Sequence, residues 1–339
     1  MDYAITDPES LQDCVGKLPA PRDMKVISFL DEHAQRWLSL SPIGLFLFGH
    51  SSELHMTLAG GAPAFAQVTD ARSLCIPRPL FEGQLPNHRT VCDGAAFASL
   101  FLVPGMKETL RINGLVTKQD GHTLALGVRE CFLHCGKALL RSDFWEAEPV
   151  DAAPSTEEEA FAQIRMLAVG TLGSEEGADV SPKGDPAGFL LRRVGDTVAF
   201  ADRPGNRRID SFRNILSQPE VRVLALIPGC SQLMEVRGQA RLTKSPAALG
   251  AFTVQGKTPR LITQVTADSL RCWDSDVLKR VELWPAPPAP KELRASDIFR
   301  DHIKLSSERG FGATAARTAV PIPGLMKRGL KADYKNNLY

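Results

Sequence analysis

"LFLVPGMKETLRINGLVT", residues Leu100–Thr117, recurs as "LALIPGCSQLMEVRGQARLT" at Leu224–Thr243. In each copy a Pro-Gly turn separates two apolar runs, which is the pattern of a β-hairpin. The spacing is constant through the hairpin, because Gly114 and Gly238 are 124 residues apart, as are the glycines of the two turns. A hairpin repeated at one spacing predicts two copies of one β-rich domain.

The same spacing extends upstream of the hairpin, where Met56–Val68 aligns with Val180–Arg192. Downstream the spacing grows, since Trp145 pairs best with Trp284, 139 residues later. The second copy therefore carries a 15-residue insertion around Ser245–Arg260, which we expect to form a short helix and a loop.

Each copy contains short strands, Gly/Pro turns and one or two helices, so we predict a mainly β (α+β) chain with peripheral helices. The expected architecture is two tandem split β-barrels that form a pseudo-dimer. The predicted domains are residues 24–150, residues 155–285, and a tail at 286–339 with one helix near Ala295–Arg309 and a basic end. A further helix is expected over Arg207–Pro219, where apolar residues recur at helical spacing.

Composition limits the class of protein. A formal charge of +1 gives no overall attraction to nucleic acid or to an anionic membrane, and no apolar run reaches the roughly 18 residues of a membrane span. Seven cysteines, an odd number, and no signal segment ahead of Met24 indicate free thiols in a reducing compartment. We therefore expect a cytoplasmic protein without nucleic-acid or membrane partners.

Positive charge distinguishes the second copy from the first. Lys183, Asn206, Arg207 and Arg208 align with Ala59, Glu82, Gly83 and Gln84, none of which is cationic. A Pro-Gly-Asn turn that opens a helix presents free backbone N–H groups, and paired arginines add forked donors that match phosphate oxygens. For an arbitrary Arg-Arg pair a solvated helix face is the better interpretation. Here a second Gly-containing loop adds Lys183, and the first copy lacks all these charges together, so a phosphate site is predicted.

The first copy has its own distinctive end, where the order His134, Cys135, Lys137 has no counterpart in the second copy and is followed by Arg141. Zinc is rejected, because no second Cys/His pair stands at ligand spacing, and buried cysteine explains the segment better. Lys137 and Arg141 share a helix face, as surface charges or as groups that reach across an interface. His134 is the candidate acid or base by residue type, with a core histidine as the alternative. No catalytic residue is assigned.

These segments, "SPKGD", "DRPGNRRIDSFRNIL", "LIPG", "VRGQARLT" and "HCGKALLRS", resemble the pyridoxamine 5'-phosphate oxidase-like superfamily of FMN-binding split β-barrels. The resemblance is strong over Ala160–Trp284 and weaker over Ile27–Trp145. Such proteins are usually single-barrel homodimers with FMN at the dimer interface. Here the arginine and lysine loops are confined to the second copy and the His-Cys-Gly-Lys segment to the first. The resemblance therefore implies a fused pseudo-dimer with one intact FMN site and one lost site; pairing within one barrel is the alternative.

The resemblance also implies which residues bind the cofactor. The predicted FMN-binding residues are Ser181, Lys183, Gly184, Asp185, Asn206, Arg207, Arg208 and Ser211 from the second copy, with Lys137 and Arg141 from the first. An aspartate beside glycine also closes turns, which is the alternative role for Asp185.

Three functions stay open. The first is an FMN-dependent oxidoreductase that acts on a small molecule, with NAD(P)H as a candidate donor. The second is a flavin-binding or storage protein without turnover, and the third is a haem-binding split barrel. A monomer and a homodimer are both compatible with the fusion. The basic end, Gly324–Tyr339, could lie over the flavin, pack on a partner or fray.

Overall fold

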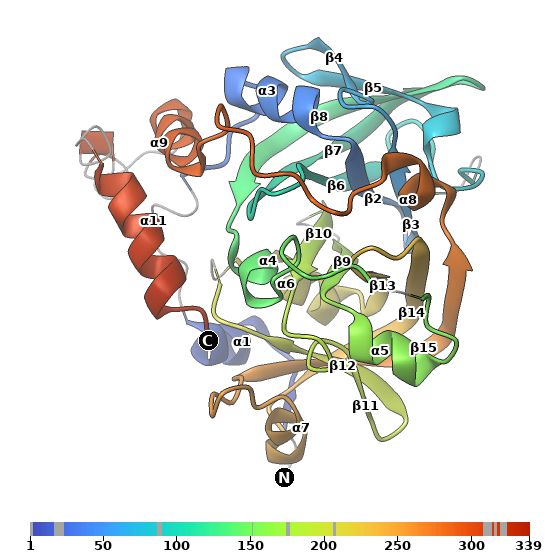
Figure 1. The fold of residues 1–339 in the computed structure, drawn as a ribbon, viewed down its shortest axis with the longest axis vertical. Coiled ribbons are helices and arrows are strands. Elements are labelled where there is room, and N and C mark those ends of the chain that lie inside the picture. Colours follow the sequence, from blue (N-terminus) through green and yellow to red (C-terminus); the bar gives the residue numbers. More distant parts are fainter. Residues whose placement is uncertain are drawn as a thin grey trace.

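The computed structural model is described for residues 3–16, 24–86, 90–150, 152–173, 177–205, 208–307, 314, 317–318 and 324–339. Two antiparallel β-sheets dominate it, one from each copy of the repeat (Figure 1). No helix among the described residues is long and apolar enough to cross a membrane.

The two sheets have the same strand order. The first contains β2 (Ile43–His50), β3 (Glu53–Gly60), β4 (Gln67–Asp70), β5 (Ser73–Pro77), β6 (Ala96–Leu102), β7 (Thr109–Gln119) and β8 (Thr123–His134), in the order β3-β2-β6-β7-β8-β5-β4. The second contains β9 (Met166–Gly173), β10 (Gly177–Lys183), β11 (Arg192–Val194), β12 (Thr197–Asp202), β13 (Glu220–Leu226), β14 (Gln232–Thr243) and β15 (Leu261–Asp274), in the order β10-β9-β13-β14-β15-β12-β11. The short strand β1 (Ala4–Ile5) pairs with β14. The predicted fold class, two tandem split β-barrels in a pseudo-dimer, is confirmed.

The repeated glycines mark an irregularity that both sheets share. The register of β7 against β8 shifts between Asn113 and Gly114, and that of β14 against β15 shifts at the equivalent pair, Arg237 and Gly238. A Cβ atom on either glycine would overlap a carbonyl oxygen of the neighbouring strand. Both positions therefore require glycine, because only a residue without a side chain permits this close approach at the bulge.

The helices follow the repeat as well. α3 (Glu32–Leu40) and α5 (Glu157–Gln163) precede the two sheets, and their N-caps Asp31 and Thr156 each accept a bond from a backbone N–H of the first turn. α4 (Lys137–Arg141) and α8 (Asp276–Val281) follow the last strand of each sheet. α7 (Pro246–Ala251) lies in the insertion, as predicted.

The remaining helices have no duplicate among the described residues. α6 (Asp210–Ser217) follows β12, within the predicted range of 207–219. α1 (Pro8–Val15) lies near the start of the chain, η1 (Arg78–Leu80) is a single 3-10 turn, and the tail contributes α9 (Ala295–Leu305) and α11 (Leu325–Asn336). The predicted tail helix at 295–309 is thus confirmed over most of its length.

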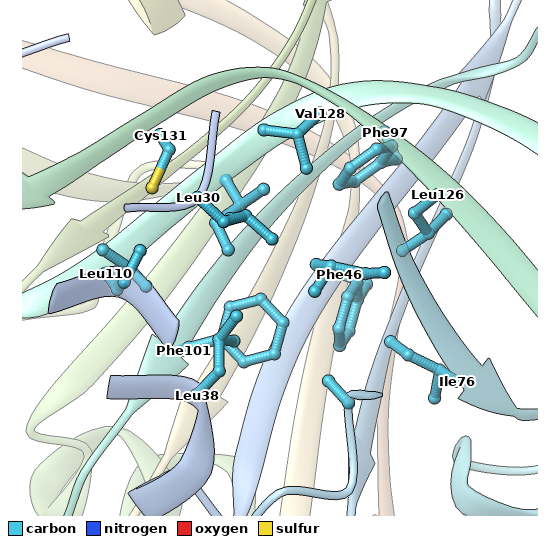
Figure 2. Packing of buried hydrophobic residues seen from close by; sticks show 14 of the residues in the cluster. Leu30, Leu38, Phe46, Ile76, Phe97, Phe101, Leu110, Leu126, Val128 and Cys131 are labelled. Atoms are coloured by element: carbon cyan, nitrogen blue, oxygen red, sulfur yellow. The ribbon is translucent and has the colours of Figure 1, made fainter. Parts of the chain in front are cut away.

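Each barrel has its own apolar core, and a third core joins the barrels. Figure 2 shows the first core, where Phe46, Phe97 and Phe101 meet Leu30 and Leu126. The third core packs Leu45, Leu47 and Leu100 of the first sheet against Val180 and Leu224 of the second. Because this apolar layer is shared, the barrels are fixed face to face, as two subunits of a dimer would be.

Two tryptophans meet beside this interface. Trp145 and Trp284, equivalent at the spacing of 139, have ring centroids 5.5 Å apart, and both rings contact Phe144. Their contact places the ends of the two repeats next to each other. α4 contacts β10 of the second copy and α8 contacts β3 of the first, which brings residues of both copies to one interface.

Candidate functional site

A pocket of about 460 Å³ contains half of the predicted cofactor residues. Lys137 and Arg141 of the first copy and Ser181, Lys183 and Arg208 of the second line it together. These residues come from α4, from β10 and from the approach to α6. The pocket thus combines both copies, although the two groups are at least 40 residues apart in the sequence.

Three other predicted residues, Gly184, Asp185 and Ser211, are buried and are not among the described residues that line the pocket. Asn206 and Arg207 lie outside the described residues. Gly184 lies directly against α4, where a Cβ atom would overlap the Ala138 carbonyl oxygen. Its role is therefore to let the two copies approach.

Two of the predicted residues from the second copy, Lys183 and Arg208, are cations in the pocket. The Lys183 ammonium is 3.0 Å from Asp202 Oδ1 and lies over the Phe212 ring, 4.7 Å from its centroid. The Arg208 Nε atom is 2.7 Å from Asp210 Oδ2, and its guanidinium lies 4.7 Å from the ring centroid of Phe132 in the first copy. Both cations are thus held by aromatic faces as well as carboxylates.

The first copy supplies Lys137 and Arg141 from α4. Lys137 is only 2% exposed, and its ammonium lies 2.9 Å from each carboxylate oxygen of Asp333 in α11. Arg141 donates from Nε to the Gly184 carbonyl at 3.0 Å and from Nη1 to the Pro204 carbonyl at 3.1 Å. Arg141 therefore ties α4 to both loops of the second copy.

Asp185 forms a buried ion pair with an arginine that we did not predict. Its Oδ2 atom accepts from Arg203 Nε at 2.7 Å, and Arg203 also donates to the Phe252 carbonyl. Burial raises the pKa of Asp185, while the charge of Arg203 acts in the opposite direction. This pair holds the β12 loop in place, which agrees with the turn-closing role considered for Asp185.

A second buried ion pair, which was also not predicted, joins the two barrels. Arg111 of β7 donates to Asp179 of β10, and both side chains are almost fully buried. Ser211 donates to the same carboxylate, and Ser181 lies 3.3 Å from Arg111 Nη2. Among the described residues Arg111 Nε has no hydrogen-bond partner. An unsatisfied donor on a buried cation in the pocket wall marks a place where a ligand acceptor would be favourable.

His134 also lines the pocket. Burial, followed by the charges of Arg111 and Lys25, lowers the pKa of His134 well below 6.5. The imidazole is therefore neutral at physiological pH, with one nitrogen able to donate and the other to accept. Cys135 beside it is half-buried, and all seven cysteines are free thiols, as predicted.

At the equivalent place in the other half of the pseudo-dimer, which we call the closed half, an acidic side chain binds the start of α8. The carboxylate of Glu82 accepts from Trp273 Nε1 at 3.1 Å, from Ser275 Oγ at 2.7 Å and from the Val277 N–H at 3.0 Å. Glu82 therefore satisfies the start of α8 with a negative charge. Ala59 and Gln84 replace the two cations there, and Asp276 replaces Lys137.

Some contacts are kept in both halves. Arg280 donates to the Leu80 carbonyl at 3.5 Å, just as Arg141 donates to the Pro204 carbonyl, and the two pairs are equivalent by the repeat. Gly60 lies against Val277 as Gly184 lies against Ala138. Contacts present in both halves hold the pseudo-dimer together. The presence of an arginine at position 141 is therefore explained by this structural contact, without a role in cofactor binding.

The fold and the pocket define the chain as a tandem split-barrel protein with a cationic pocket lined by both of its copies. A scan against known protein families matches none, and no curated protein matches the sequence. Among solved structures, HupZ of Group A Streptococcus is similar over 36% of this chain and 95% of its own, with 13% identity and a TM-score of 0.29. An F420 reductase is similar over 35% of this chain and 98% of its own, with 15% identity and a TM-score of 0.27. A putative pyridoxamine 5'-phosphate oxidase from Listeria innocua is similar over 34% and 94%, with 13% identity and a TM-score of 0.26. Similarities this low assign no function.

Proposed function

We propose that the chain binds one FMN in the pocket between its barrels and acts as a flavin-dependent oxidoreductase on a small molecule. The observation that carries the proposal is the convergence of Lys137 of the first copy with Ser181, Lys183 and Arg208 of the second on a single pocket. The resemblance of the sequence to FMN-binding split barrels named these residues independently of the pocket.

The residues fit a phosphorylated cofactor. Lys183 and Arg208 offer charged donors and Ser181 a hydroxyl, while the start of α6 adds the positive end of a helix of eight residues. These groups would hold the phosphate. The unsatisfied Nε of Arg111 and the neutral His134 would face the remaining, less charged part of the ligand. A pocket of about 460 Å³ lies within the usual range for small-molecule sites.

The proposed reaction divides its tasks among the flavin, the residues of the chain and an electron donor. The flavin would supply the transfer of hydride or single electrons when bound. The chain's own residues would bind and orient it: Arg111 fixes a positive charge at the pocket wall, and the apolar layer between the barrels keeps the two half-sites in register. A nicotinamide nucleotide is the candidate electron donor. Without a donor that reduces the flavin, the chain would be a flavin-binding or storage protein.

The absorption spectrum of the purified protein tests this proposal. Bands near those of free flavin, and release of FMN on denaturation, are expected. Anaerobic mixing with NADPH or NADH then separates an oxidoreductase, whose flavin bleaches, from a storage protein, whose flavin stays oxidised. A colourless protein that takes up no added FMN would reject both.

A haem protein is the second candidate, and His134 is the observation that favours it. Its lowered pKa keeps the imidazole neutral, which is the state that can ligate iron. The same spectrum decides, because haem gives a strong Soret band that His134→Ala would shift or abolish.

A further inference from the structure

The tail enters the same pocket that we assign to the cofactor. α11, red in Figure 1, packs against α9 and runs along the edge of the molecule, and Asp333, Asn337 and Tyr339 line the pocket. Neither copy of the repeat contains an equivalent of this segment.

Tail groups hold three of the pocket's cations. The Asp333 carboxylate forms an ion pair with the Lys137 ammonium at 2.9 Å. The Leu338 carbonyl accepts a hydrogen bond from Arg141 Nη1 at 3.0 Å. The centroid of the Tyr339 ring lies 5.6 Å from the Arg203 guanidinium. Among the described residues, Asp333 is the only side chain that forms a hydrogen bond or ion pair with the Lys137 ammonium, so the tail provides the negative charge that this buried ammonium needs.

The tail is anchored just outside the pocket. Tyr334 donates to Glu108 at 2.7 Å and accepts from the Gly136 N–H at 2.9 Å. Burial raises the pKa of Glu108 and raises that of Tyr334 well above 10, so the phenol keeps its proton. Tyr334 thus fixes the helix, while Asp333 and the residues after Asn336 extend into the pocket.

We propose that Asp333–Tyr339 is a strap that takes the place of an anion in the ligand-free chain and is displaced when a phosphate ester binds. The proposal rests on the proposed function for the identity of the ligand, which we take to be FMN. An incoming phosphate and the Asp333 carboxylate cannot share one buried ammonium without repulsion between like charges. Ligand binding and strap closure are therefore coupled, and the coupling is reciprocal.

Titration calorimetry with the full chain tests the strap, with FMN and inorganic pyrophosphate as separate probes at fixed ionic strength. Asp333→Asn keeps the shape of the side chain and removes the charge, so FMN is expected to bind about five- to tenfold more tightly than to wild type. Asn336→Ala, an exposed change on the same helix, is the matched control and should leave the Kd unchanged.

Each result decides between the two proposals. If wild type and Asp333→Asn bind FMN with equal affinity, or the variant binds more weakly, the strap is rejected and the flavin site stands. If neither binds FMN but the variant binds pyrophosphate more tightly, the strap stands and the flavin assignment falls. If neither probe binds either protein, both proposals fall.

Hydrogen exchange of the peptide that contains residues 333–339 gives a second readout. In wild type, saturation with FMN should speed exchange of this peptide, because the ligand displaces it from Lys137. Slower exchange on FMN binding would show that the tail closes over the ligand and would overturn displacement.

Discussion

The two halves of the pseudo-dimer place the same elements around two equivalent positions, yet the two positions carry opposite charges. At the first, Lys137, Lys183 and Arg208 line a cavity. At the second, Glu82 binds the start of α8, and Asp276 and Ala59 stand where two of the lysines would be. After duplication the contacts that hold the barrels together were kept, while the charges diverged. Residues kept in both halves therefore serve the fold, and residues that differ between the halves are the candidates for ligand binding.

The ion pair behind the pocket diverged in the same way. Arg111 and Asp179 correspond by the repeat to Glu235 and His55. Beside the pocket, Arg111 and Asp179 form an ion pair, and Ser211 donates to the same aspartate. In the closed half, His55 Nε2 has no hydrogen-bond partner among the described residues. The charges were exchanged at both positions, so the closed half cannot be a weaker version of the same anion site.

The largest expected effect is loss of FMN binding when the second-copy cations are removed. Lys183→Ala with Arg208→Ala should weaken binding by about 3–6 kcal/mol, because each charged hydrogen bond to phosphate is worth about 1.5–3 kcal/mol. Fluorescence titration with FMN measures the change. Gln84→Ala, at the position equivalent to Arg208, is the control and should have no effect; an unchanged Kd in the double variant would remove the phosphate assignment.

Acid should destabilise the closed half through His55. Burial lowers its pKa from 6.5 to about 4, against the opposing charge of Glu235. Between these pH values the unfolded chain binds a proton that the folded chain does not, so the free energy of unfolding falls as the pH is lowered, by about 2 kcal/mol between pH 7 and pH 4.5.

Urea unfolding at pH 7 and pH 4.5 measures this loss. His55→Gln removes the titrating group, so the variant should lose correspondingly less stability between the two pH values than wild type. Equal losses in both proteins would show that His55 does not carry the acid sensitivity.

A smaller effect is expected from the first-copy lysine. Lys137→Met keeps the buried volume but removes the charge, and FMN binding should weaken about tenfold to fiftyfold if α4 contributes across the barrel interface. Asp276→Ala changes the equivalent position in the closed half and serves as the control. Intact affinity in the lysine variant would confine the site to the second barrel.

The smallest effect should come from Glu82. Glu82→Ala leaves the Ser275 hydroxyl and the Val277 N–H without their acceptor, which should lower the free energy of unfolding by about 1–2 kcal/mol. FMN affinity should not change, because the pocket lies in the other half. Thermal unfolding and FMN titration of the same variant check both expectations.

Much of the fold could be predicted from the repeat alone. The spacing of 124 predicted the hairpins, and its growth to 139 predicted the insertion, because backbone requirements leave a pattern in every copy. The bulges at the repeated glycines were not predicted, although they obey the same spacing. The same comparison contained Arg111 against Glu235 and could have identified the buried pair. Neither the Arg203 pair with Asp185 nor the strap could be found this way. The first is a contact between side chains on separate loops, and the tail has no second copy with which to compare it.

One measurement tests the central claim that the fused barrels keep a single cofactor site. Apo-protein of known concentration is titrated with FMN to saturation, and the bound flavin is quantified after denaturation. We predict one FMN per chain, lost in the Lys183→Ala, Arg208→Ala variant and kept in Glu82→Ala. Two FMN per chain, or one that survives loss of both cations, would contradict the account.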